Sequence, residues 1–78
     1  MNKQAAAFQM TRSEQETQNE ANRLTVQIET ALAAVVMRSP DDADSLESAA
    51  DRIERAARDL ATAIRGLAQE RKAANDQS

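Results

Sequence analysis

The sequence predicts an all-α protein, an antiparallel two-helix hairpin (αα-hairpin) that associates into a four-helix bundle or packs on the helices of a partner. The 78 residues are rich in good helix formers and include one glycine and one proline. The pair Ser39-Pro40 divides the chain into two long segments. In the second segment, large apolar residues recur every seven positions, which keeps one side of a helix apolar over many turns. These residues are Leu46, Ile53, Leu60 and Leu67.

The first helix is expected to span about residues 11–38. Thr11 and Ser13 are both candidate N-caps, because each is followed three residues later by a glutamate, as a capping box requires. Residues 1–10 are expected to be a flexible N-terminal segment or an extension of this helix. The predicted apolar side of the helix consists of Ala21, Leu24, Ile28, Ala31 and Val35.

The turn is expected at about residues 39–44, and the second helix from residue 40 or 45 to about residue 74. Ser39 is a good N-cap, Pro40 suits the first helical position, and the acidic residues that follow suit the positive end of the helix dipole. Residues 75–78 are expected to form a frayed tail. The helical hairpin therefore covers about residues 11–74.

Folding the chain about Pro40 pairs positions whose numbers add up to about 80. Near the turn the predicted pairs are apolar: Val35–Leu46, Ile28–Ile53 and Leu24–Ala57. At the open end the first helix is polar, so that Ile64 and Leu67 would face Thr17 and Glu14. An apolar helix side should not face a polar partner over two turns. The outer part of the second helix is therefore predicted to contact another surface.

The segment 31–37 is apolar on all sides of the helix, whereas a two-helix hairpin covers only one side of each helix. The remaining apolar side chains would form an exposed patch on a monomer, and such patches are typical of interaction sites. Together with the outer part of the second helix, this patch predicts a protein interface. Its residues are Val26, Leu32, Val36, Met37, Leu60, Ile64 and Leu67.

Composition argues against an enzyme. The chain has no histidine and no cysteine, and we expect no catalytic, cofactor-binding or metal-binding residues. The expected partner is a protein, the chain itself (as a homodimer), or both, and neither a membrane nor a small-molecule substrate. The sequence shows no signal peptide and no segment long enough to span a bilayer, which predicts a cytoplasmic protein, or one of the host cytoplasm if the chain is phage-encoded.

Nucleic-acid binding is a further alternative. Arg58, Arg65 and Lys72 are spaced by seven on the outer side of the second helix and could contact phosphates. The layout resembles the architecture of Rop, a plasmid copy-number protein that binds RNA with helical hairpins, although no shared motif carries residues across. Acidic residues interrupt the three cations, no aromatic side chain is available there for base stacking, and the net charge is −3. A solvated charged face is the favoured interpretation.

The function favoured by the sequence is a non-enzymatic protein–protein interaction module, acting through the apolar side of the second helix and the 31–37 patch. Examples are a phage-encoded inhibitor of a host protein and a small secretion-type chaperone. Secretion co-chaperones that form short antiparallel hairpins are similar in size and layout. The alternatives are a self-assembling structural four-helix bundle and a Rop-like RNA- or DNA-binding hairpin.

Overall fold

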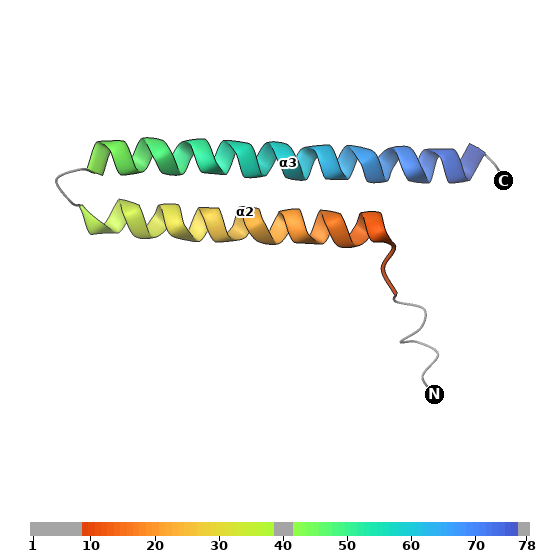
Figure 1. Cartoon of the computed structure of the whole chain (residues 1–78), viewed down its shortest axis with the longest axis horizontal. Coiled ribbons are helices and arrows are strands. Elements are labelled where there is room, and N and C mark those ends of the chain that lie inside the picture. The colour runs from red at the N-terminus through yellow and green to blue at the C-terminus, as the bar shows by residue number, and fades with distance from the viewer. Residues whose placement is uncertain (1–8, 39–41, 77–78) are drawn as a thin grey trace, which may run out of the picture.

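A computed structural model describes residues 9–38 and 42–76 of the chain. Helix α2 spans Arg12–Met37 and helix α3 spans Asp42–Asp76. The two helices lie side by side and run in opposite directions (Figure 1). The described residues therefore form the all-α helical hairpin that the sequence predicts.

Helix α2 begins with a complete capping box at Thr11. The backbone N–H of Glu14 donates to Thr11 Oγ1 (3.1 Å), and the backbone N–H of Thr11 donates to Glu14 Oε1 (2.9 Å). Of the two candidate N-caps, the structure therefore selects Thr11. The helix ends at Met37, where Arg38 adopts a left-handed conformation (φ 53°, ψ 59°) and turns the chain.

Helix α3 carries Asp42 and Asp44 in its first turn, where carboxylates are favoured by the helix dipole. It continues to Asp76, so Asn75 and Asp76 are helical rather than part of a frayed tail. The predicted cap at Ser39 and Pro40 lies outside the described residues, and so does most of the predicted N-terminal segment 1–10.

The two helices meet along one seam, which alternating spacings of three and four residues mark on each helix. Ala49 and Ala56 are the buried apolar residues, at 5% and 2% exposure. Helix α2 has no buried residue, and the rest of the seam is half-buried apart from Leu46 at the turn end, which is 36% exposed. The seam consists of Ser13, Thr17, Glu20, Leu24, Gln27, Ala31 and Ala34 on α2, and Leu46, Ala49, Ile53, Ala56, Leu60, Ala63 and Leu67 on α3.

The register of this seam differs from the sequence prediction. Polar side-chain contacts between the described parts of the two helices show this register: Ser13 to Glu70, Glu14 to Arg71, and Arg23 to Asp59. Their residue numbers add up to 83, 85 and 82, rather than to about 80. Ile28 and Val35 were predicted to form apolar pairs with Ile53 and Leu46 near the turn. In the structure they are instead 42% and 55% exposed.

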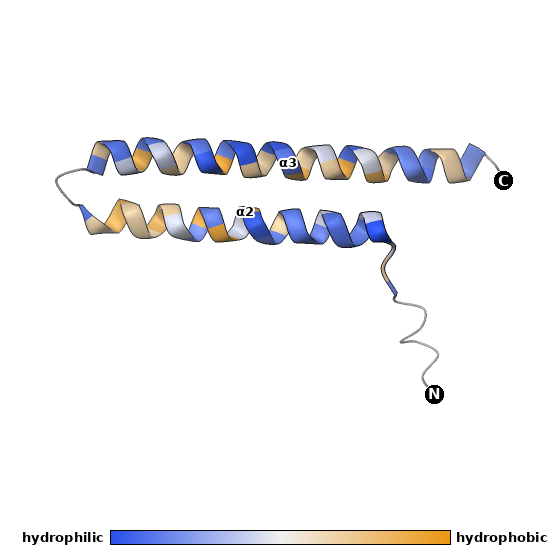
Figure 2. Ribbon diagram, in the orientation of Figure 1, coloured by the Kyte–Doolittle hydropathy of each residue, from blue (hydrophilic) through white to orange (hydrophobic). Residues whose placement is uncertain are grey.

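The shifted register has a physical reason. Alanines at positions 31, 34, 49 and 56 let the two backbones approach closely near the turn, which larger side chains in the seam would prevent. The ion pairs between Glu14 and Arg71 at the open end and between Arg23 and Asp59 near the middle fit a register shifted in the same direction. Apolar residues are concentrated in the half of α2 next to the turn, and its N-terminal half is polar (Figure 2).

Candidate protein-binding surface

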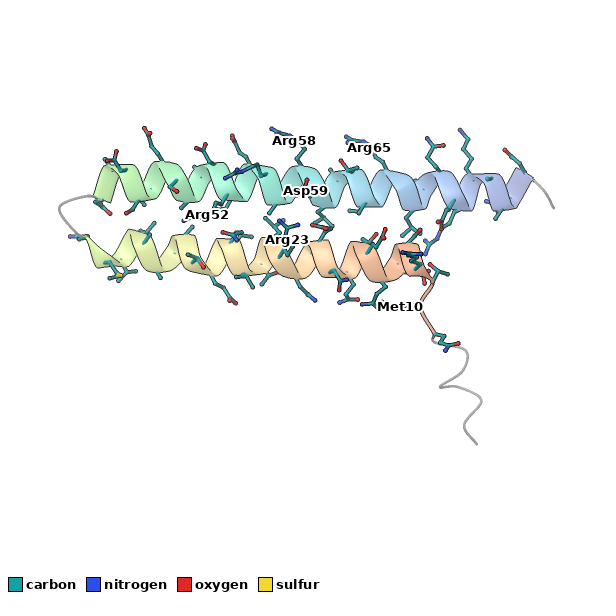
Figure 3. The ribbon with its side chains drawn as sticks, viewed as in Figure 1. Met10, Arg23, Arg52, Arg58, Asp59 and Arg65 are labelled. Atoms are coloured by element: carbon teal, nitrogen blue, oxygen red, sulfur yellow. The ribbon has the colours of Figure 1, made fainter. Side chains whose placement is uncertain are left out.

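Two cross-helix ion pairs mark the two edges of the seam. Arg71 Nη2 donates to Glu14 Oε2 at 2.8 Å, and Arg23 Nη1 lies 3.7 Å from Asp59 Oδ2. Glu14 and Arg23 are nine residues apart, or about two and a half turns, which places them on opposite sides of α2. The hairpin therefore has two distinct open edges, one containing each ion pair (Arg23 and Asp59 are labelled in Figure 3).

One edge is apolar. Steps of seven residues from Glu14 and Arg71 toward the turn follow the same side of each helix and reach only apolar side chains. Leu32 lies one turn from Ile28 on the same side and is 61% exposed. We call this surface the apolar edge, and it consists of Ala21, Ile28, Leu32 and Val35 on α2 and of Ala50, Ala57 and Ile64 on α3.

Polar groups along the apolar edge are either paired or peripheral. The hydroxyl of Thr25 donates to the backbone carbonyl of Ala21 (3.0 Å), so this side chain can be buried without losing its hydrogen bond. Glu47 and Glu54 lie about one turn from Ala50 and border the edge on α3. An apolar centre with a charged border is the usual anatomy of a protein interface.

The opposite edge is polar. Steps of seven from Arg23 and Asp59 reach Glu16, Thr30 and, at the turn end, the apolar Met37 on α2, and Arg52 and Gly66 on α3. Arg23 also contacts Glu20 at 2.8 Å, and Arg52 Nη1 donates to Ser48 Oγ at 2.7 Å. We call this surface the polar edge, and it consists of Glu16, Arg23, Thr30, Arg52, Asp59 and Gly66.

The structure separates the residues predicted for the interface into three groups. Leu32 and Ile64, which is 49% exposed, belong to the apolar edge. Leu60 and Leu67 are half-buried in the seam. Of the others, Val36 borders the apolar edge one turn from Leu32 and is 76% exposed, whereas Val26 and Met37 are 55% and 73% exposed on other sides of α2.

Sequence reasoning missed Ile28 and Val35 as surface residues, because it placed them in the seam. The spacing of seven that links them to Ala21 is visible in the sequence, but it does not tell on which side of the seam they lie.

A hollow of about 760 Å³ lies at the open end of the hairpin, beside Ala21. It occupies the region where the sequence predicted a mismatch between a polar first helix and apolar residues of the second. Leu67 is the lining residue that comes from α3. Met10, which is 47% exposed, also lines the hollow. The lining residues are Gln9, Met10, Thr11, Glu14, Thr17, Gln18, Ala21 and Leu67.

The three cations considered for nucleic-acid binding lie on α3 alone. Arg58 and Arg65 project from the side of α3 that points away from α2 (Figure 3), and Lys72 follows at the same spacing. Asp51 precedes them on the same line. The fold therefore places no cation of α2 beside Arg58, Arg65 and Lys72.

Glu14 is the carboxyl group that the structure perturbs clearly. Its pKa is lowered from the ordinary value of 4.5, first by the hydrogen bond from the Thr11 backbone N–H and then by the hydrogen bond from Arg71. This carboxylate holds the helix cap and the seam together. Among residues 9–38 and 42–76, no cluster of three or more potential metal ligands occurs, and no helix is both long and apolar enough to cross a membrane.

Comparisons with protein-family models, with curated proteins and with solved structures found no match for this chain.

Proposed function

We propose that this chain is a non-enzymatic protein-interaction module that binds a protein through the apolar edge of the hairpin. The observation that supports the proposal most is the exposure of four large aliphatic side chains on this edge. Ile28, Leu32, Val35 and Ile64 are 42%, 61%, 55% and 49% exposed. Complete burial of such a side chain contributes about 1.5–3 kcal/mol, so a protein that covers the edge gains a substantial binding energy.

The proposed surface differs from the one expected from the sequence. It keeps Leu32 and Ile64, adds Ile28 and Val35, and leaves Leu60 and Leu67 to the seam. A phage-encoded inhibitor of a host protein or a small secretion-type chaperone could use a surface of this kind, because an apolar helix side can pack on the helices of another protein.

The test compares two matched substitutions in the tagged chain expressed in its native cell. Leu32→Glu places a charge on the apolar edge, whereas Ala33→Glu places one on the exposed side of α2 next to Thr30. We expect the Leu32→Glu variant to lose the protein that co-purifies with the wild type in stoichiometric amount, whether that protein is a foreign one or a second copy of the chain. The Ala33→Glu variant should retain this protein. The proposal fails if both variants bind the same proteins in the same amounts as the wild type.

A further inference from the structure

We infer that the apolar edge is covered by the apolar edge of a second copy, with the turns of the two hairpins at the same end of a four-helix bundle. This inference rests on the proposed function and identifies the protein that occupies the surface. In this arrangement a two-fold axis parallel to the helices places α2 of each copy beside α3 of the other.

The hairpin alone has almost no core. Ala49 and Ala56 are the buried apolar residues of the described chain, and their side chains are single methyl groups. Isolated helices are marginal in water, and most helix stability in proteins comes from the packing of an apolar side. A hairpin with so small a core needs its apolar edge buried against another protein in order to stay folded. A second copy of the chain is available for this wherever the chain is made.

The apolar edge is complementary to itself in shape. At three levels of the apolar edge, one helix carries a large aliphatic side chain and the other an alanine, and Leu32 lies between two of these levels. The pairs at equal level are Ala21 with Ile64, Ile28 with Ala57, and Val35 with Ala50, and their numbers add up to 85, as those of Glu14 and Arg71 do. A two-fold axis parallel to the helices keeps these levels, so each large side chain of one copy faces an alanine of the other.

Charge selects the same arrangement. With the turns at the same end, Glu14 of each copy lies at the level of Arg71 of the other, which joins opposite charges at the open end. With the turns at opposite ends and the edges fully overlapped, Val35 would instead face Glu14 and Ala50 would face Arg71. That arrangement buries charges against apolar side chains, which costs stability.

The polar edge explains why association stops at two copies. It carries Arg23, Arg52 and Asp59 and is not complementary to the apolar edge. Each hairpin therefore offers one self-complementary surface, and such a surface closes a symmetric dimer rather than a filament.

The first test measures association by sedimentation equilibrium. We expect the wild type to be a dimer at tens of micromolar. Ala57 is exposed in the hairpin, so Ala57→Glu should weaken the dimer about 100-fold or more by burying unpaired carboxylates, while Ala33→Glu should leave it unchanged. A folded wild-type monomer at 200 µM would overturn the inference and leave the proposed binding of another protein standing, because that binding is scored separately with Leu32→Glu.

The second test measures the arrangement directly and uses the absence of native cysteine. Chains with Ala50→Cys are mixed with chains carrying either Val35→Cys or Arg71→Cys, and the mixed disulfides are identified by mass. We expect the Ala50→Cys chain to link to the Val35→Cys chain. Preferential linkage to the Arg71→Cys chain would show that the turns lie at opposite ends and would overturn the inference.

Discussion

Glu14 links the start of α2 to the end of α3. Its carboxylate accepts hydrogen bonds from the backbone N–H of Thr11 and from Arg71, and both bonds favour the ionised form. The same residue therefore sets the first turn of one helix and the register between the two helices.

The pH dependence of stability should report this role. Because the folded-state pKa of Glu14 lies below the ordinary value of 4.5, its contribution is present above pH 4.5 and is lost as the pH falls through the lowered pKa. We expect Glu14→Gln to be less stable than the wild type at pH 7, and the difference in unfolding free energy to shrink below pH 4.5. Urea titrations from pH 7 to pH 3 measure it, and a constant difference would contradict the assignment.

Gly66 lies on the polar edge, where a Cβ atom would meet no other atom within 4 Å. We expect Gly66→Ala to stabilise the protein by about 0.5–1 kcal/mol, because alanine loses less backbone entropy in a helix. Urea unfolding measures the gain, and sedimentation should show unchanged association. A loss of stability would mean that another backbone packs against Gly66 in the assembled protein.

At the level of the element, the capping box fixes where α2 begins. We expect Thr11→Ala to lower the unfolding free energy by about 1 kcal/mol, because the backbone N–H of Glu14 loses its acceptor. Thr11→Ser keeps the hydroxyl and should retain most of the stability. Equal losses in the two variants would show that the side-chain hydrogen bond is not what stabilises the helix start.

The two helices and the cap at Thr11 could be predicted from the sequence, because helix propensity, the single proline and the capping box are local signals. The register could not. Glu20 and Gln27 occupy seam positions of α2, and a polar residue in a seam gives no hydrophobic signal. Centring the turn on Pro40 then gave a sum near 80 rather than one between 82 and 85, a difference of two to five residues.

The side of α2 that faces α3 decides which residues are available for binding. Leu32 and Ile64 could be found from the sequence because their exposure does not depend on the exact register. Ile28 and Val35 could not, because the seam of α2 passes through Gln27 and Ala34 instead, and neither residue gives a strong hydrophobic signal. The alternation of large side chains and alanines across the apolar edge becomes visible only when the register is known.

At the scale of the whole molecule, the hairpin exposes its large aliphatic side chains and buries alanines. Its described core, Ala49 and Ala56, can offset little of the conformational entropy lost on folding, which amounts to about 1–2 kcal/mol for the backbone of each residue. The central claim is therefore that folding of this chain is coupled to the covering of the apolar edge, and a second copy is the proposed cover.

Thermal unfolding as a function of protein concentration tests this claim most directly. We expect the midpoint, followed by circular dichroism, to rise steadily between about 0.5 and 200 µM, because the folded state is the associated state. Ala57→Glu should shift the whole series to lower temperature, and Ala33→Glu should not. A monomer that unfolds cooperatively at a concentration-independent midpoint of about 45–65 °C, the ordinary range for stable domains, would contradict the account.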